Sequence, residues 1–294
     1  MPLPASLTQK DAETRNQGLR QAVSLSANKA GPIDGLRIGL NLLLMVAQAA
    51  VPAVTQIPGF IDVQGLTDIG TRSAQSPSLL TPPDFSFAIW GLIFAAMAGY
   101  AVYQALPANW ADARLRRVGW WTAAAMALNT AWEFVTAWRG ITFATVVLIF
   151  LMLVVLLKAF SALHHGQKLK PVEAALVVFP ISIFAAWITV ACVLNSVSWL
   201  FNAGGVGFGG VAEGTWAGAF AVLAGAIGAT VIWINRGNAF YTAVLVWAFG
   251  GIIYKAIGLS ESVLLVGAVV GLLIVLTAFV RRPAASALDL ENLR

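Results

Sequence analysis

The sequence predicts an all-α polytopic membrane protein with eight transmembrane helices, and its composition is the first reason. Of the 294 residues, 59% are hydrophobic and only 11% are charged, against about a quarter in ordinary soluble domains. The mean hydropathy is +0.80. A soluble enzyme needs far more charged surface, whereas helices that face lipid need apolar side chains. The composition therefore excludes a soluble globular enzyme.

The second reason is the length of the apolar segments. Eight runs each contain enough residues to cross roughly 30 Å of hydrocarbon as a helix. They lack the alternating polarity of barrel strands. Only Arg139 and Gly140 separate the third run from the fourth, so these two must form a tight hairpin. The runs are 36–56, 85–106, 118–138, 141–163, 172–195, 215–234, 239–258 and 261–280.

The basic residues predict how these helices are oriented. With a cytoplasmic N-terminus, fifteen of the 18 Lys and Arg residues lie on the cytoplasmic side, and only Arg72, Arg139 and Lys255 lie on the other. Loops on the cytoplasmic side of membrane proteins carry such an excess. We therefore expect a multi-pass protein of the bacterial cytoplasmic membrane with both termini inside. The net charge of +5 reflects this topology, and we expect no nucleic-acid partner.

Some segments look like sites but have a simpler explanation. The glycines of residues 205–210 have the spacing of a dinucleotide loop, but no strand precedes them, so we expect a loop that folds back into the interface. His164 and His165 follow the fourth run, where a solvated role is favoured over metal binding. Cys192, inside an apolar run, is expected to be a packing residue. We predict no metal site and no catalytic residue.

Polar and aromatic residues inside the third run form the first candidate site. Asn129, Trp132, Glu133 and Thr136 follow helical spacing and share one face. Glu133 is the only acid well inside a predicted span, and a buried carboxyl there must be protonated, paired or facing water. It is thus a candidate functional group. The alternative is a structural acid, hydrogen-bonded or paired with Arg139.

The second and fifth runs add further candidates. Trp187, Ala191 and Asn195 are each four residues apart and share a face, and Pro180, two turns earlier, can kink the helix and widen a cavity. Trp90 follows two prolines that fix the start of its helix.

Four tryptophans, Trp90, Trp132, Trp187 and Trp247, lie deeper than the others, which fall near the membrane interfaces. Deep indoles beside an Asn and a carboxyl suit a flat, largely apolar ligand. Core packing is the alternative for each residue taken singly.

Three motifs resemble those of the TspO/MBR family, the tryptophan-rich sensory proteins. The family's second helix opens with Pro-Pro, an aromatic residue and a Trp, and residues 82–91 (PPDFSFAIWG) are similar. Its third helix carries Leu-Asn-x-x-Trp, and residues 128–133 (LNTAWE) match this motif. Its fifth helix carries a Trp and, eight residues later, the Asn of a Leu-Asn pair, and residues 187–195 match this spacing. The resemblance covers residues 36–195. The chain departs from it at Ile183 in place of a proline and Val193 in place of a tyrosine, and Glu133 replaces a small residue.

The resemblance implies a cavity among the first, second, third and fifth helices, covered by the loop between the first two. It implies a non-enzymatic binding or sensory protein that holds a tetrapyrrole, a sterol or a similar lipophilic ring compound. Degradation of a porphyrin would follow only by analogy with the family. The resemblance does not assign a cofactor, and the candidates for a bound molecule are a porphyrin and a lipid. The carried-over residues are Trp90, Asn129, Trp132, Trp187, Ala191 and Asn195, and Glu133 joins them from its place in the third run.

Domain organisation follows from the same comparison. We expect a flexible cytoplasmic tail (1–35), a five-helix membrane domain like that of the TspO/MBR family (36–195), a three-helix extension with a glycine-rich outer loop (196–282) and a second cytoplasmic tail (283–294). The expected partners are a lipophilic small molecule, membrane lipids, and a second copy or a larger membrane complex.

Two other functions stay open at this stage. Small residues four apart, Gly214 with Gly218 and Gly267 with Gly271, allow close helix approach. The extension would then dock an accessory subunit into a larger assembly, with packing inside the chain as the alternative. The other function is a transporter of a lipophile with Glu133 as its titrating group, although the sequence shows no repeat.

Overall fold

The structure is a computed structural model that describes residues 29–56, 66–75, 77–163, 170–204, 208–235 and 237–282. Residues 1–28 and 283–294, His164, His165 and residues 205–207 of the glycine-rich segment lie outside this part of the chain. Throughout the described ranges the regular structure is helical, without a strand. The predicted all-α class is confirmed.

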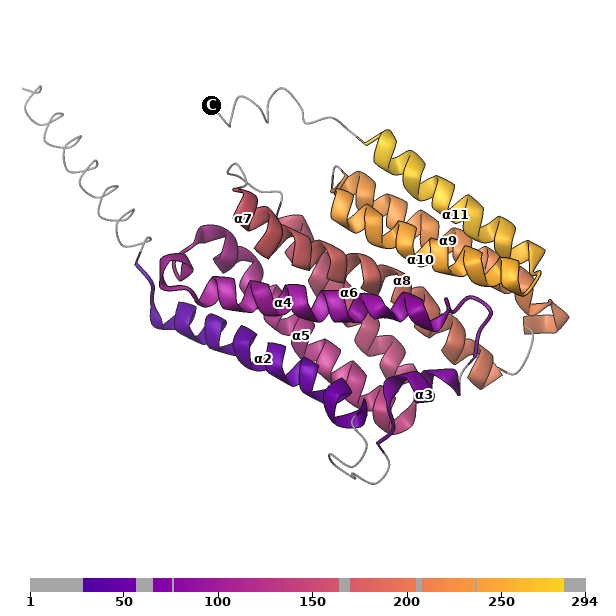
Figure 1. Ribbon diagram of the computed structural model, residues 1–294, viewed down its shortest axis with the longest axis horizontal. Helices are drawn as coiled ribbons and strands as arrows, with labels where there is room; N and C mark the ends of the chain where they lie inside the picture. Colours follow the sequence, from indigo (N-terminus) through magenta and orange to yellow (C-terminus); the bar gives the residue numbers. More distant parts are fainter. Residues whose placement is uncertain are drawn as a thin grey trace, which may run out of the picture.

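Eight long helices correspond to the eight predicted runs (Figure 1). Seven of them are long and apolar enough to cross a membrane. The remaining one, α5, has 27 residues but contains more polar and charged side chains, so it stays a predicted span. The eight are α2 (Pro32–Gln56), α4 (Ile89–Ala105), α5 (Ala113–Arg139), α6 (Phe143–Ala162), α8 (Phe179–Gly204), α9 (Glu213–Ile234), α10 (Ala239–Gly258) and α11 (Ser262–Val280).

Short helical segments connect or extend the long ones. They are α3 (Ile69–Ala74), α7 (Pro171–Glu173), the 3-10 turns η1 (Asp84–Ala88), η2 (Pro107–Asn109) and η4 (Phe208–Gly210), and the π-helical turn η3 (Ala174–Val178). The two prolines before α4, Pro82 and Pro83, thus lead into a 3-10 turn before α4 begins. A π-helical turn precedes Pro180, so the irregularity in this helix lies one turn before the proline where we expected a kink.

Two helix boundaries differ from the sequence prediction. The first helix begins at Pro32, inside the predicted tail, because Asp34 accepts a hydrogen bond from the Gly31 backbone N–H and pairs with Arg37. The helix α8 continues beyond Asn195 to Gly204, and Ser196 lies within it, with its hydroxyl donating to the Cys192 carbonyl. The expected boundary at residue 195 therefore lies within a helix.

The hairpin between α5 and α6 is as tight as predicted. Gly140 ends α5 with a φ of 74°, a left-handed conformation that glycine adopts without strain. Thr142 then caps α6, accepting a hydrogen bond from the Thr145 N–H, while the Thr145 hydroxyl accepts one from the Thr142 N–H. This reciprocal arrangement starts the helix at once after the turn.

Five helices, α2, α4, α8, α6 and α5, form a closed ring in that order. In this ring α2 packs against α4 and α5, α6 packs against α5 and α8, and α4 packs against α8. At one end α3 lies against α5, where the Thr67 N–H and the Arg72 guanidinium both donate to the Ala137 carbonyl. The ring is the scaffold that places the candidate residues.

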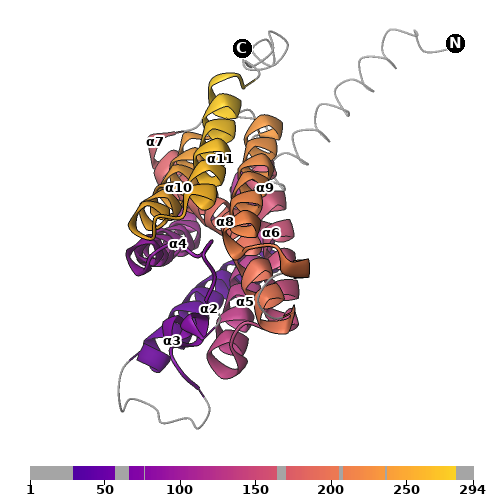
Figure 2. The same ribbon diagram turned by 90° about the vertical axis from the view of Figure 1, so that its right-hand side faces the viewer.

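The last three helices, α9, α10 and α11, form a layer on one side of this ring (Figures 1 and 2). Both α9 and α10 pack against α8, and α11 packs against α9 and α10. The helix α8 is consequently covered on nearly all sides and is the most buried of the spans. The described start of α2 and the described end of α11 lie toward the same end of the bundle (Figure 1).

The layer is held together by glycines. A Cβ atom on Gly225 would lie 2.5 Å from the Gly271 Cα, and one on Gly218 would lie 2.7 Å from the Val263 carbonyl oxygen. A Cβ on Gly267 would in turn meet the Gly218 backbone. The small residues that the sequence offers as a docking surface are therefore used for packing within the chain.

Candidate ligand-binding site

An aromatic cluster of three tryptophans lies inside the ring, with one tryptophan from each of three helices. The Trp90 ring on α4 stacks on the Trp132 ring of α5 with centroids 6.3 Å apart and meets the Trp187 ring of α8 edge-on at 6.4 Å. Trp187 is 1% exposed and Trp132 is 7% exposed. The three predicted indoles thus come together from positions far apart in the sequence.

Phenylalanines complete this cluster. Phe94 stacks on Trp90, and Phe184 meets Trp90 edge-on. Phe87 contacts Trp187 in the same edge-on manner. Aromatic faces at these separations attract each other beyond the area they bury. The same faces are suited to stack on a flat ring.

Asn195 links the aromatic cluster across the ring. The Trp132 Nε1–H donates to Asn195 Oδ1 at 3.2 Å and so ties α5 to α8. Asn195 is 8% exposed, and Ala191, one turn earlier on the same face, is buried as well. The small side chain at Ala191 limits how far this face of α8 extends toward the tryptophans.

Asn129 and Glu133 form a second, polar group beside the tryptophans. The Asn129 Nδ2 donates to Glu133 Oε1 at 2.9 Å and to Gln48 Oε1 of α2 at 3.4 Å. Asn129 and Glu133 are 0% and 2% exposed. Arg139 instead lies over the Trp138 ring at 4.0 Å. Of the two structural alternatives for Glu133, the structure contains the hydrogen bond and not the pair with Arg139.

The sequence prediction missed a polar stripe on α2 that faces α5. Arg37, 1% exposed, donates to Gln104 Oε1, and Asn41 donates to the Gly119 carbonyl and accepts from the Thr122 hydroxyl. With Gln48, these α2 residues follow spacings of four and seven. This spacing places the three polar side chains on one face of the helix. Within an apolar run, it was the pattern from which the stripe could have been predicted.

Charged residues close one end of the stripe. Arg116 and Arg37 both pair with Asp34, at 2.7 and 3.4 Å, and Arg114 pairs with Glu173 of α7 at 2.8 Å. Buried charges in a membrane protein are stable when paired in this way. The candidate residues Asn129 and Glu133 lie toward the opposite end of α5.

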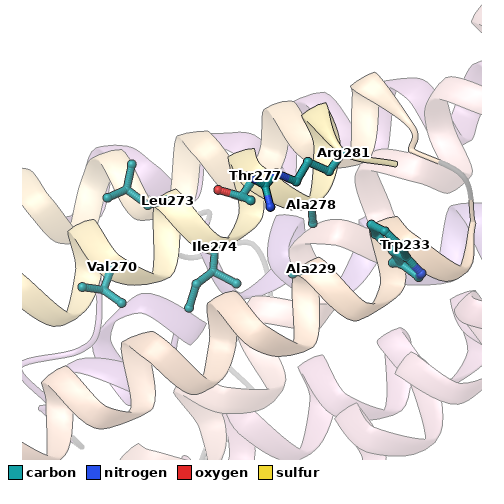
Figure 3. Close-up of a pocket in the computed structure, with 8 residues that line it drawn as sticks. All are labelled: Ala229, Trp233, Val270, Leu273, Ile274, Thr277, Ala278 and Arg281. Atoms are coloured by element: carbon teal, nitrogen blue, oxygen red, sulfur yellow. The ribbon is translucent and has the colours of Figure 1, made fainter. Parts of the chain in front are cut away.

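Two apolar hollows lie outside the ring. One of about 390 Å³ is formed by α9 and α11, with Trp233 and Arg281 near one end of its lining (Figure 3). Another of about 380 Å³ lies between α4, α8 and α10 and includes Trp247. The fourth tryptophan predicted to be deep is therefore not part of the aromatic cluster; it is 43% exposed and donates to the Ser86 carbonyl.

The remaining chemistry in the described part of the chain is sparse. No group of three His, Cys, Asp or Glu side chains that could hold a metal is found among the residues searched. Cys192 is buried, and its thiol donates to the Ile149 carbonyl. The site is therefore built from indoles, amides, one carboxyl and hydroxyl groups.

The fold and the site define an integral multi-pass membrane protein with an aromatic and polar interior. A family model described as TSPO-like protein matches residues 40–280. The chain therefore belongs to the TSPO-like protein family. Membership of this family suggests ligand binding or sensing at the membrane. The match continues through α9, α10 and α11, beyond the five helices that carry the sequence resemblance. No curated protein and no solved structure matches the chain.

Proposed function

We propose that this protein binds a lipophilic ring compound, such as a tetrapyrrole or a sterol, inside the ring of five helices and does not convert it chemically. The observation that carries the proposal is the aromatic cluster of Trp90, Trp132 and Trp187 in the interior of the ring. Flat apolar ligands are held by such faces and oriented by a few hydrogen bonds. Asn195, Asn129 and Glu133 supply these polar atoms.

The proposal assigns separate roles to the candidate residues. Trp90 and Trp187 would contact the ring of the ligand, and Trp132 would both stack and keep its bond to Asn195. Ala191, with its small side chain, would let the ligand approach α8 beside them. We further propose, from the distribution of basic residues, that the described start of α2 and end of α11 face the cytoplasm of a bacterium.

A fluorescence titration tests the proposed function. The full chain in lipid nanodiscs is titrated with the dimethyl ester of protoporphyrin, which has the flat ring without free carboxylates, while its tryptophan emission is followed. Empty nanodiscs give the nonspecific background. We expect saturable quenching, and Trp90→Phe and Trp187→Phe should each weaken binding about two- to tenfold, the effect of losing part of an aromatic contact.

Trp233→Phe is the matched control. Trp233 is 51% exposed and lines the hollow between α9 and α11 (Figure 3). Its replacement should leave the affinity unchanged. Quenching that never saturates, or that is weakened by Trp233→Phe and not by the ring variants, would refute the proposed site.

A further inference from the structure

Three buried oxygen atoms on one face of α5 lack a hydrogen-bond partner. They are Asn129 Oδ1, Glu133 Oε2 and Thr136 Oγ1. The three side chains are between 0% and 2% exposed. Their spacing of four and then three residues places them on successive turns of the same face. We call these atoms the acceptor cluster.

The orientation of the Asn129 amide follows from its partners. Its Nδ2 donates to Glu133 Oε1 and Gln48 Oε1. Turning the amide over would break both of these bonds and place its oxygen against Gln48 Oε1, which is unfavourable. The free atom of Asn129 is therefore an acceptor. Glu133 likewise has one oxygen bonded and one oxygen free.

No positive charge in the described residues compensates Glu133. The ion pairs there join Asp34 to Arg37 and Arg116, and Glu173 to Arg114, all at the other end of α5. A buried polar atom without a partner destabilises the protein, and more so when it is charged. The acceptor cluster thus gains most from a group that donates hydrogen bonds.

The acceptor cluster is continuous with the aromatic cluster. Trp132 lies on the same face of α5 between Asn129 and Thr136, and its ring stacks on Trp90. A ring compound against these indoles would bring its substituents close to the free oxygens. Among the described residues Glu133 is buried without a cation beside it, and it therefore carries its proton when no ligand is bound. An ammonium substituent would displace this proton to the solvent and pair with the carboxylate, whereas a carboxylate substituent would add a second acid with no cation.

We infer that the acceptor cluster selects lipophilic ring compounds that carry an ammonium or another N–H donor beside the ring. This inference rests on the proposed function, since the aromatic cluster binds the ring of the ligand while the acceptor cluster binds the substituent on that ring. Once its proton has been displaced, Glu133 Oε2 accepts the strongest of the new bonds, because a bond between charged groups exceeds one between neutral groups. Asn129 and Thr136 accept the remaining donors.

A series of matched probes tests this selectivity. Pyrenemethylamine, methylpyrene and pyrenecarboxylate share one flat apolar ring and differ only in the substituent. Energy transfer from tryptophan to pyrene is measured with the full chain in nanodiscs, and the signal of empty nanodiscs is subtracted. The amine should bind about tenfold or more tightly than methylpyrene, and the carboxylate more weakly than both, as expected for a charge-assisted hydrogen bond.

Variants assign the preference to the acceptor cluster. Glu133→Gln keeps the shape of the side chain and should bring the ratio of the affinities for the amine and for methylpyrene close to one. Thr136→Val should reduce the amine preference a few-fold and serves as a second variant with a smaller perturbation. Glu261→Gln, outside the ring, removes the same charge from the chain and should change nothing.

The outcomes separate the two proposals. If no pyrene shows saturable transfer, the aromatic site itself is refuted. If methylpyrene binds and the amine shows no preference, or if Glu133→Gln retains the preference, the aromatic site stands and the selectivity of the acceptor cluster is overturned. Equal loss of all three probes in Glu133→Gln with an unchanged melting temperature also contradicts the inference, because a donor-specific contact cannot produce it.

Discussion

The helices of the five-helix ring and those of the three-helix layer pack against each other in opposite ways. Inside the ring, bulky indoles and buried amides separate the helices and bond across the space between them. In the layer, glycines let the backbones of α9 and α11 touch. An interior made of large side chains can rearrange around a ligand, whereas direct backbone contact cannot. The contrast is consistent with the proposed ligand binding in the ring and with close backbone packing in the layer.

The two regions pack together along α8 and are also joined by hydrogen bonds at the segment before α4. Lys255 of α10 donates to the carbonyls of Ser78 and Thr81 at 3.0 and 2.8 Å, and Glu213 of α9 accepts from the Leu79 N–H at 2.7 Å. This segment leads directly into the helix that carries Trp90. The layer thus fixes the start of a ring helix.

The largest effect on this comparison is expected from Gly225→Ala. Its new Cβ would lie 2.5 Å from both the Cα and the carbonyl oxygen of Gly271, so the α9 and α11 backbones must separate. We expect a loss of about 2 kcal/mol in stability, typical of overpacking, measured as a lower melting temperature in detergent. Gly250→Ala is the control, because nothing lies within 4 Å of its Cβ position. Equal stability of the two variants would disprove direct backbone packing in the layer.

A smaller effect is expected from Lys255→Met, which tests the contact between the regions. The substitution leaves the carbonyls of Ser78 and Thr81 without this donor, at a cost of about 1 kcal/mol for these partly buried groups. Backbone hydrogen exchange in residues 77–88 should become faster. Lys158→Met, an exposed position on α6, should leave the exchange as it is. Unchanged exchange in the Lys255 variant would show that the layer does not hold this segment.

The smallest effect is expected at α3, on the end of the ring. Thr71 hydrogen-bonds to Asp68 and holds the pKa of that carboxyl below its ordinary value of 3.8. Because the folded pKa is lowered, the stabilisation is present above the ordinary value and is lost as the pH falls through the folded pKa. Asp68→Ala should therefore speed hydrogen exchange in α3 at neutral pH, by about 0.5 kcal/mol in opening free energy for this exposed cap.

Lowering the pH provides the check on this last prediction. Once the pH is below the pKa of Asp68, wild type and Asp68→Ala should exchange alike after correction for intrinsic rates. A difference that persists in acid would mean that Asp68 acts on α3 through something other than its charge.

The fold was largely accessible from the sequence, and the site only in part. Runs of apolar residues located all eight helices, because burial in lipid demands continuous hydrophobicity. Helical spacing also identified Asn129, Trp132 and Glu133 as one face. The contacts between Trp90, Trp132 and Trp187 depend on how three distant helices pack, which spacing within one helix does not determine. The buried pair of Asp34 and Arg37 was missed, because the sequence does not show which charged side chains pack into the interior.

The enclosed position of α8 has a consequence for the way the chain is made. Thr189 in the middle of α8 shares a hydrogen bond with the Tyr241 hydroxyl of α10, and Ser182 accepts one from Asn238 just before α10. Both partners are synthesised after α8. Until α10 has been inserted, this face of α8 is exposed to acyl chains that offer no hydrogen bonds. The outer face of α8 in the five-helix ring therefore gains these hydrogen-bond partners only after α10 has been synthesised and inserted.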